Sequence, residues 1–171
     1  VDHFVVEAKA GQRISAEIEA MRLGIEFFDP YVAILDENRF ELASSDDSAL
    51  HLQDSVASVV APKDGKYIVQ VRDSSYGGNG NAHYRLHVGT FPRPTAVFPT
   101  GGKPGETIEF TFIGDPAGPI KQSITLPPDA NDRFPIFPMS EGLSAPSPHW
   151  ITVSPIESLR ETAANHDAGT S

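Results

Sequence analysis

Apolar and polar side chains alternate one by one along most of this chain. The stretch RISAEIEA at residues 13–20 is the clearest instance. Its apolar members are Ile14, Ala16, Ile18 and Ala20, and its polar members are Arg13, Ser15, Glu17 and Glu19. Because neighbouring side chains of a β-strand point to opposite faces, this pattern predicts a half-buried strand. A helix is the alternative, since Ala and Glu favour helices and Ile14, Ile18 and Met21 also fit helical spacing.

The same alternation recurs through the first 90 residues. KYIVQVRD and HYRLHV each place an aromatic residue and two aliphatic residues on one face. The other candidate strands are DHFVVEA, YVAILD, RFELAS and SVASVVA. Turn-forming segments such as SSDDS, PKDG and YGGNGN separate them. Short strands joined by frequent turns are typical of a β-sandwich.

The composition changes near Phe91, where Pro92, Pro94 and Pro99 follow in close succession. Proline is disfavoured inside sheets and suits a stiff linker, so we place a domain boundary here and expect restricted motion across it. Alternation resumes in ETIEFTFIGD, followed by IKQSITLP, RFPIFPMS and HWITVSP. The sequence therefore predicts an all-β chain of two tandem antiparallel β-sandwiches.

The predicted domains are residues 1–90 and 91–156, the second of small, immunoglobulin-like size. The segment 157–171 is polar and has little to bury, so we expect a linker or disordered tail. The chain starts within a strand pattern and shows no signal peptide, which indicates a fragment of a longer protein.

Charge and composition argue against several classes of function. The formal net charge of −10 leaves no basic stripe for phosphates, which disfavours nucleic acid and anionic membranes as partners. No apolar run approaches the roughly 20 residues that a membrane-spanning helix needs, so we expect no membrane insertion. The chain has no cysteine, which excludes disulfides and thiolate metal ligands.

Four segments, in their order along the chain, carry a resemblance to a known family: VDHFVVEAKAGQRISAEI, DPYVAILDENRFELASSDDS, DSVASVVAPKDGKYIVQVRD and HYRLHVG. Together they resemble the bacterial pre-peptidase C-terminal domain family. The resemblance implies a jelly-roll-like β-sandwich that lies outside the cell beside secreted proteases and other exported proteins. It further implies a domain without catalytic activity. Some relatives bind calcium, and some bind polymers such as collagen.

The second part carries a looser resemblance. PTAVFPTGGKPGETIEFTFIGD is similar to the opening of immunoglobulin-like domains of the transcription-factor/plexin type, and LRETAANHD is similar to the acidic segment that precedes another pre-peptidase domain. These resemblances imply an exported bacterial protein that is built of alternating modules. The partners would be neighbouring domains of that protein and extracellular polysaccharide or protein.

Residues 29–55 hold seven carboxylates and one base, Arg39, which is a net of −6 in one stretch. Calcium binds six to eight oxygens, often from several carboxylates. In a sandwich the loop ends that carry Asp29, Asp46, Asp47 and Asp54 can meet, and they are the candidate calcium ligands. The alternative is that these residues cap turns and keep the surface charged, since Asp readily hydrogen-bonds nearby backbone N–H groups.

The remaining chemical motifs are sparse. Tyr76 lies within the glycine-rich loop and is the candidate for an exposed aromatic residue that stacks on a sugar ring or contacts a peptide. Trp150 in PHWITV is expected in the core, with its indole N–H bonded to a partner. His83 and His87 are four apart on a predicted strand, roughly 13 Å, which is too far for one zinc ion. No G-x-S-x-G elbow and no phosphate-binding glycine motif occurs. We therefore expect accessory, adhesion or spacer modules that are not an enzyme, with a calcium-dependent polysaccharide- or protein-binding module as the alternative.

Overall fold

The computed structural model describes residues 1–25, 27–48, 54–78 and 80–156. These residues form fifteen strands and one short 3₁₀ turn, with no α-helix among them. The predicted all-β sandwich fold is thereby confirmed. No helix in the described part of the chain has the length and apolar character needed to cross a bilayer.

Residues up to 89 build two antiparallel sheets that face each other. The four-stranded sheet contains β1 (Asp2–Ala8), β6 (Gly65–Asp73), β3 (Pro30–Leu35) and β4 (Glu41–Ser45), in that order. The three-stranded sheet contains β5 (Val56–Val60), β2 (Arg13–Glu19) and β7 (Arg85–Gly89). The alternating stretch at residues 13–20 is therefore a strand, as predicted. Only the three residues Met21–Leu23 that follow it coil, as the 3₁₀ turn η1.

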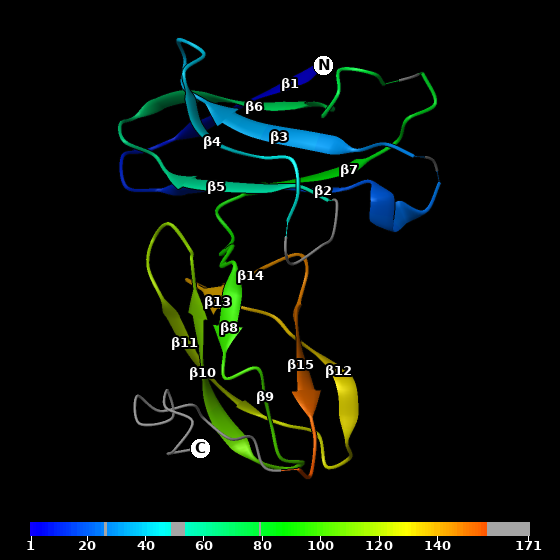
Figure 1. The fold of residues 1–171 in the computed structure, drawn as a ribbon. Helices are drawn as coiled ribbons and strands as arrows, with labels where there is room; N and C mark the ends of the chain where they lie inside the picture. Colours follow the sequence, from blue (N-terminus) through cyan, green and yellow to red (C-terminus); the bar gives the residue numbers. More distant parts are fainter. Residues whose placement is uncertain (26, 49–53, 79, 157–171) are drawn as a thin grey trace, which may run out of the picture.

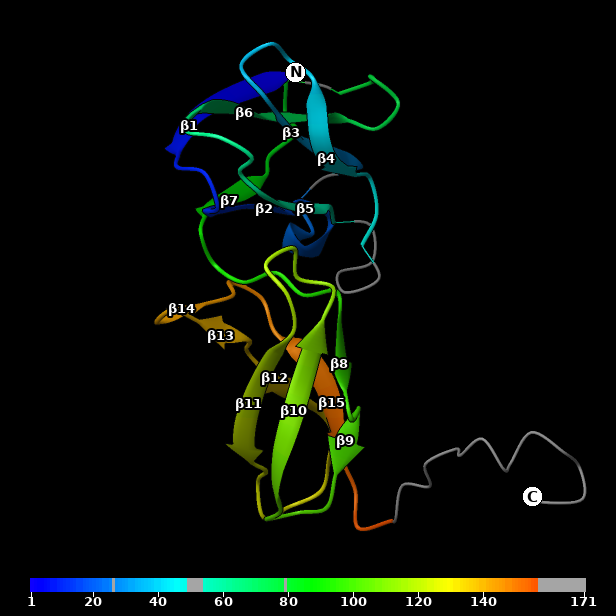
Figure 2. The same ribbon diagram turned by 90° about the vertical axis from the view of Figure 1, so that its left-hand side faces the viewer.

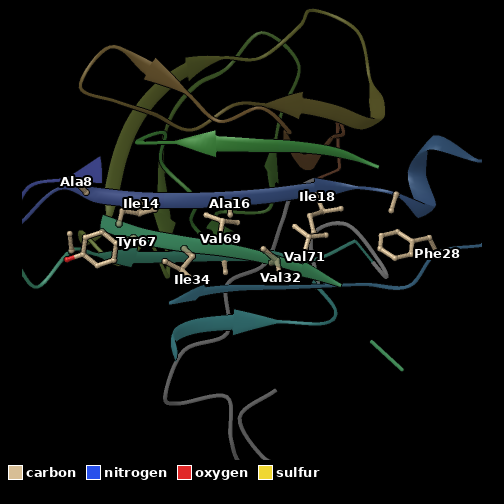
Figure 3. Packing of buried hydrophobic residues seen from close by; sticks show 13 residues of the cluster. Ala8, Ile14, Ala16, Ile18, Phe28, Val32, Ile34, Tyr67, Val69 and Val71 are labelled. Atoms are coloured by element: carbon tan, nitrogen blue, oxygen red, sulfur yellow. The ribbon is translucent and has the colours of Figure 1, made fainter. Parts of the chain in front are cut away.

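The apolar face of each strand fills the space between these two sheets. Ile14, Ala16 and Ile18 of β2 point toward Val69 and its neighbours on β6 and β3 (Figure 3). The whole buried cluster comprises Ala8, Ile14, Ala16, Ile18, Ala20, Phe28, Val32, Ile34, Ala57, Ala61, Tyr67, Val69 and Val71. Ten of these thirteen residues lie on strands, and Ala20, Phe28 and Ala61 lie just outside them. A two-residue pattern therefore predicts most of a core of this kind.

Residues 96–153 build a second, smaller sandwich. One sheet contains β11 (Ile120–Thr125), β10 (Thr107–Ile113) and β8 (Ala96–Phe98). The other contains β12 (Asn131–Ile136), β15 (His149–Val153) and β9 (Gly101–Gly102), beside the separate hairpin of β13 (Met139–Ser140) and β14 (Leu143–Ser144). Its buried cluster is Phe110, Phe112, Leu126, Ile136, Ile151 and Val153. The predicted boundary at residue 91 lies between the two clusters.

One strand pair departs from the predicted antiparallel pattern. β9 pairs with β15 in parallel, because the chain passes from β8 in one sheet to β9 in the other without reversing. The two strands approach closely, and a Cβ at Gly101 would lie 2.2 Å from the carbonyl oxygen of Thr152. Glycine is therefore required at this position.

The two sandwiches, called here the first module (residues 1–89) and the second module (residues 96–153), stack end on end (Figures 1 and 2). The β5–β2–β7 sheet lies between the first core and the second module (Figure 1). One end of the second module abuts the outer face of that sheet (Figure 2). The outer face of β2 is thus at the junction of the modules.

Candidate functional site

The outer, polar face of β2 is buried rather than solvated. Ser15 and Glu17 are 0 % exposed and Arg13 is 7 % exposed, although Ile14, Ala16 and Ile18 already fill the core on the other face. The prediction of a half-buried strand is therefore wrong for β2, because the second module covers its polar face. The polar face of β2, which the alternating pattern assigns to solvent, is therefore part of the interface between the two modules.

Glu17 is the centre of this interface. Its carboxylate forms an ion pair with Arg93 of the linker at 2.9 Å and with Arg22 of η1 at 3.2 Å. Ser147, in the segment before β15, donates its hydroxyl hydrogen to the same carboxylate and accepts one from Arg22 at 2.9 Å. One carboxylate of the first module thus binds the linker and, through Ser147, the second module.

A second group of contacts lies beside the first. Arg13 donates to Asp115 of the second module at 2.9 Å, and Asp115 also accepts the backbone N–H of Arg93 at 2.7 Å. Arg13 further donates to the carbonyl of Thr90, and Ser15 donates to the carbonyl of Phe91. The linker is therefore held along its length by polar side chains of β2.

Local structure explains how Asp115 reaches this position. Asp115 follows β10 and accepts the backbone N–H of Ala117, which fixes the turn that carries it. Gly114, just before it, has a φ of 86°, and a Cβ there would lie 2.0 Å from the Thr95 hydroxyl oxygen. Glycine at this position lets the turn pack directly against the linker.

Asp54 anchors Arg22 from the side of the first module. Its carboxylate accepts the backbone N–H groups of Ala20, Met21 and Arg22, and it pairs with the Arg22 guanidinium at 2.5 Å. Ala20 offers no capping side chain at the start of η1, so Asp54 supplies the cap from another segment. We call the six charged residues together the junction cluster: Arg13, Glu17, Arg22, Asp54, Arg93 and Asp115.

The junction cluster holds three positive and three negative charges, so it is neutral as a whole. The side chains of Glu17, Asp54, Arg93 and Asp115 are fully buried, and removing them from water costs several kcal/mol per ion unless each is paired. Burial lowers the pKa of Arg93, and the Glu17 carboxylate opposes that shift. Part of this pairing depends on the two modules staying together, because Arg13 pairs with Asp115 of the second module and Arg93 donates to the carbonyl of Ser147.

His149 lies behind Arg93 at the start of β15. Its ring meets the Phe112 ring edge-on, and only 2 % of the residue is exposed. Burial, and then the positive charge of Arg93, lower the pKa of His149 to about 4, while a hydrogen bond to the Pro94 backbone works in the other direction. His149 is therefore neutral at pH 7 and becomes charged only on marked acidification.

The structure does not bring the four predicted calcium ligands together. Asp54 is engaged with Arg22 and three backbone N–H groups, and Asp29 accepts the Ser74 hydroxyl at 2.5 Å. Asp46 and Asp47 contribute their backbone carbonyls to hydrogen bonds from Ser55 and Ser45. No group of three or more His, Asp or Glu side chains suited to a metal ion occurs within the described residues. The prediction of one calcium site at these residues is not supported, since their oxygens serve local turns and the junction instead.

Several acidic residues instead organise backbone turns, the alternative raised by the sequence. Asp36 accepts the N–H groups of Asn38 and Phe40, and Asp73 accepts those of Ser75 and Gly77. Such bonds satisfy donors that the turn leaves without a partner. In the acid-rich stretch, Asp36 therefore holds a turn and Asp54 holds η1.

Tyr76 is exposed, as predicted, with 72 % of its surface in water. The Arg72 guanidinium lies 4.1 Å from the centre of the Tyr76 ring and 3.7 Å from that of Tyr31, so the arginine is stacked between the two rings. Tyr31 in turn donates to Glu41 at 2.6 Å. Tyr76 has a φ of 57°, which is costly for a residue other than glycine. The Asp73 turn holds this backbone, and the ring presents one open face to solvent.

The histidine and tryptophan positions differ in part from expectation. His87 pairs with Glu19 at 2.9 Å, whereas His83 precedes β7 and donates to the carbonyl of Asn81. The two histidines share no partner among the residues that the structure describes. Trp150, which we expect in the core from its size, is 45 % exposed, with Arg133 4.5 Å above its ring.

Four residues of the junction were not identified from the sequence: Arg22, Arg93, Asp115 and Ser147. Each is a single polar residue in a short turn, a loop or the linker, and none belongs to a motif. The one usable signal is Arg93, a long cation between Pro92 and Pro94 where a linker otherwise needs no charge. Its partner Glu17 is 76 positions away, which no local pattern reveals.

Comparisons of the chain with protein-family models, with curated proteins and with solved structures found no match. The resemblance to the pre-peptidase C-terminal family therefore stays a prediction.

Proposed function

We propose that this chain is a rigid pair of accessory modules without catalytic activity, which acts as a spacer in an exported multidomain bacterial protein. The observation that carries the proposal is the junction cluster, which ties the two sandwiches together by buried charges. The resemblance of residues 1–90 to pre-peptidase C-terminal domains supports the exported context.

The physical argument starts from the default behaviour of linked domains. Two domains joined by a short linker are expected to move relative to each other unless their interface is extensive or specific. Here four buried ionised side chains have partners across or beside the junction. Separating the modules would part Arg13 from Asp115 and Glu17 from Ser147, so one relative orientation is strongly favoured. A fixed orientation is the property that a spacer needs.

Small-angle X-ray scattering on the purified chain tests this proposal. We expect a profile that one arrangement of residues 1–156 fits, and a broader distribution of distances for Arg93→Met, which removes the buried cation. Arg85→Met is the matched control, because Arg85 pairs with Glu19 inside the first module and lies away from the linker. If the wild-type profile requires many inter-module orientations, the spacer proposal fails.

A second candidate function is polysaccharide binding by the Tyr31–Arg72–Tyr76 stack. The observation that favours it is the combination of an exposed ring, a costly backbone conformation and a guanidinium that holds the ring flat. The open face of an aromatic ring packs well on the C–H face of a sugar. Because the stacked Arg72 already restricts the rotamers of Tyr76, this side chain loses less conformational entropy when a ligand binds.

Pull-down with insoluble polysaccharides tests this candidate. We expect retention of the wild-type chain and loss of retention in Tyr76→Ala. Phe40→Ala is the control, because Phe40 is an equally exposed aromatic residue of the same module, at 71 %. Equal retention of the two variants would show that the stack is not the binding element.

A further inference from the structure

β1 is an open edge of the four-stranded sheet. It pairs with β6 over seven consecutive residues without a register shift, from Asp2↔Val71 to Ala8↔Gly65. On its other side no strand of the described residues pairs with it. An open edge presents unpaired backbone N–H and C=O groups, and proteins normally protect such edges from other chains.

Most of the other edges carry such protections. β5 (Val56–Val60) has none of them in its sequence, but β4 of the opposite sheet lies close beside it. β4 contains a bulge in its pairing with β3 at Ile34/Leu35, and β12 has both Pro135 and a register shift. β7 carries Arg85 and His87, β11 carries Lys121, and β8 and β9 are three and two residues long. The sequence DHFVVEA of β1 has no proline, no lysine and no bulge. Its polar side chains are Asp2, His3 and Glu7, all exposed.

The surface of β1 is also apolar for an edge. Val5 on the outer face is 63 % exposed, and Phe4 on the inner face is 41 % exposed. Phe4 is uncovered because four strands face only three, so the opposite sheet ends at β7. A 150 Å³ cavity lined by Val6, Ile14 and Val88 lies at this edge of the core, between β1 and the end of the opposite sheet. Another strand at this edge would cover it.

We propose that β1 is the dimerisation edge of this protein, and that its partner is β1 of a second copy, antiparallel and with Val5 on the two-fold axis. The sequence of β1 is complementary to itself in this register. His3 then lies opposite Glu7 of the partner on the outer face, twice by symmetry, and Phe4 lies opposite Val6 on the inner face. Hydrogen-bonded polar pairs and apolar pairs directly across from each other stabilise antiparallel strands, and a two-fold axis forms each pair twice.

The neighbouring symmetric registers lack this complementarity. A two-fold axis at Phe4 places His3 opposite Val5 and Asp2 opposite Val6. An axis at Val6 places His3 opposite Lys9, so that the ring N–H of His3 faces the lysine ammonium, a donor opposite a donor. The polar side chains of β1 therefore select the axis at Val5.

Hydrogen bonding within one copy prepares His3 for this contact. The side-chain amide nitrogen of Gln70 lies 3.0 Å from His3 Nε2, so Nε2 accepts and the ring proton is on Nδ1. Nδ1–H is thus the donor that remains for Glu7 of the second copy. Glu7 is exposed, and its side chain has no hydrogen bond or ion pair with any other residue that the structure describes. The dimer would contain one continuous sheet through both copies.

Analytical ultracentrifugation over a range of concentrations tests the inference. We expect a reversible dimer of the wild-type chain. Val5→Lys sets two like charges on the axis and raises the dimer Kd by about tenfold or more. Val5→Thr keeps a β-branched side chain and is the control, for which we expect a Kd close to that of the wild type. Matching melting temperatures of both variants would show that each monomer stays folded.

A charge exchange tests the register itself. His3→Glu sets carboxylates opposite each other and weakens the dimer, and the double variant His3→Glu/Glu7→Lys restores the complementary pairs and with them the dimer. A wild-type chain that stays monomeric, or a double variant as weak as His3→Glu, overturns the inference. Formation of ever larger oligomers as the concentration rises would show that the contact does not close into a dimer, and this result would also overturn the inference. This result does not depend on the spacer proposal, which scattering tests at concentrations where each copy is monomeric.

Discussion

Glu17→Gln is the substitution that examines the junction most sharply. It keeps the shape of the side chain and removes one negative charge from a group that is 0 % exposed. Arg93, also fully buried, then loses its carboxylate at 2.9 Å, and Arg22 loses one of its two. Removing one partner of a buried ion pair typically costs about 3–5 kcal/mol, because the remaining charge stays desolvated.

Equilibrium unfolding in urea, followed by fluorescence and circular dichroism, measures this loss. We expect one coupled transition for the wild type, and for Glu17→Gln a midpoint lowered to match a loss of about 3–5 kcal/mol, with the two probes no longer coincident. Glu19→Gln is the matched control: it lies on the same strand and face, but it pairs with Arg85 and His87 inside the first module. For this more exposed pair we expect a loss of about 1 kcal/mol or less. A Glu17→Gln chain within 1 kcal/mol of the control would refute the reasoning.

Three further predictions follow from the buried charges and turns. The folded pKa of His149, about 4, lies below its ordinary value of 6.5. The neutral His149 therefore contributes fully to stability above pH 6.5, and about 3 kcal/mol of that contribution is lost as the pH falls to 4. Urea unfolding of the wild type and of His149→Gln at several pH values measures this loss. The difference in unfolding free energy between the two chains should shrink by that amount as the pH falls. Asp54→Asn should lower the unfolding free energy by about 3 kcal/mol, whereas Asp47→Asn, at an exposed position, should stay within about 0.5 kcal/mol, both measured in urea. Millimolar calcium or a chelator should leave the melting temperature unchanged, since the four aspartates do not converge; a rise of several degrees with calcium would contradict their placement.

Local alternation predicted the strands and much of the core. Ile14, Ala16 and Ile18 are buried together, as are Tyr67, Val69 and Val71, at the positions that a two-residue period assigns to one face. The same rule also explains the one aromatic residue that we placed incorrectly. Within HWITV the period assigns His149, Ile151 and Val153 to the inside and Trp150 to the outside, and the structure follows the period rather than the size of the indole ring.

Local sequence patterns could not predict the junction, because its contacts join residues that lie far apart in the sequence. Arg13 and Asp115 are 102 positions apart, and Ser147 and Glu17 are 130 apart. Polar residues on alternate positions of β2 are equally consistent with water or with another module as their neighbour. Asp54 shows the same ambiguity: a carboxylate at a loop end suits a calcium ion, a turn or an arginine, and the choice depends on whether Arg22 is within reach.

Double electron–electron resonance between the two modules tests the central claim most directly. The chain has no cysteine, so Lys66→Cys and Asp129→Cys, both at exposed positions, give one spin label on each module without background labelling. A single narrow distance distribution is expected, and it should widen when Arg93→Met is added. A broad distribution in the labelled wild-type chain would show that the buried charges do not hold the modules in one orientation.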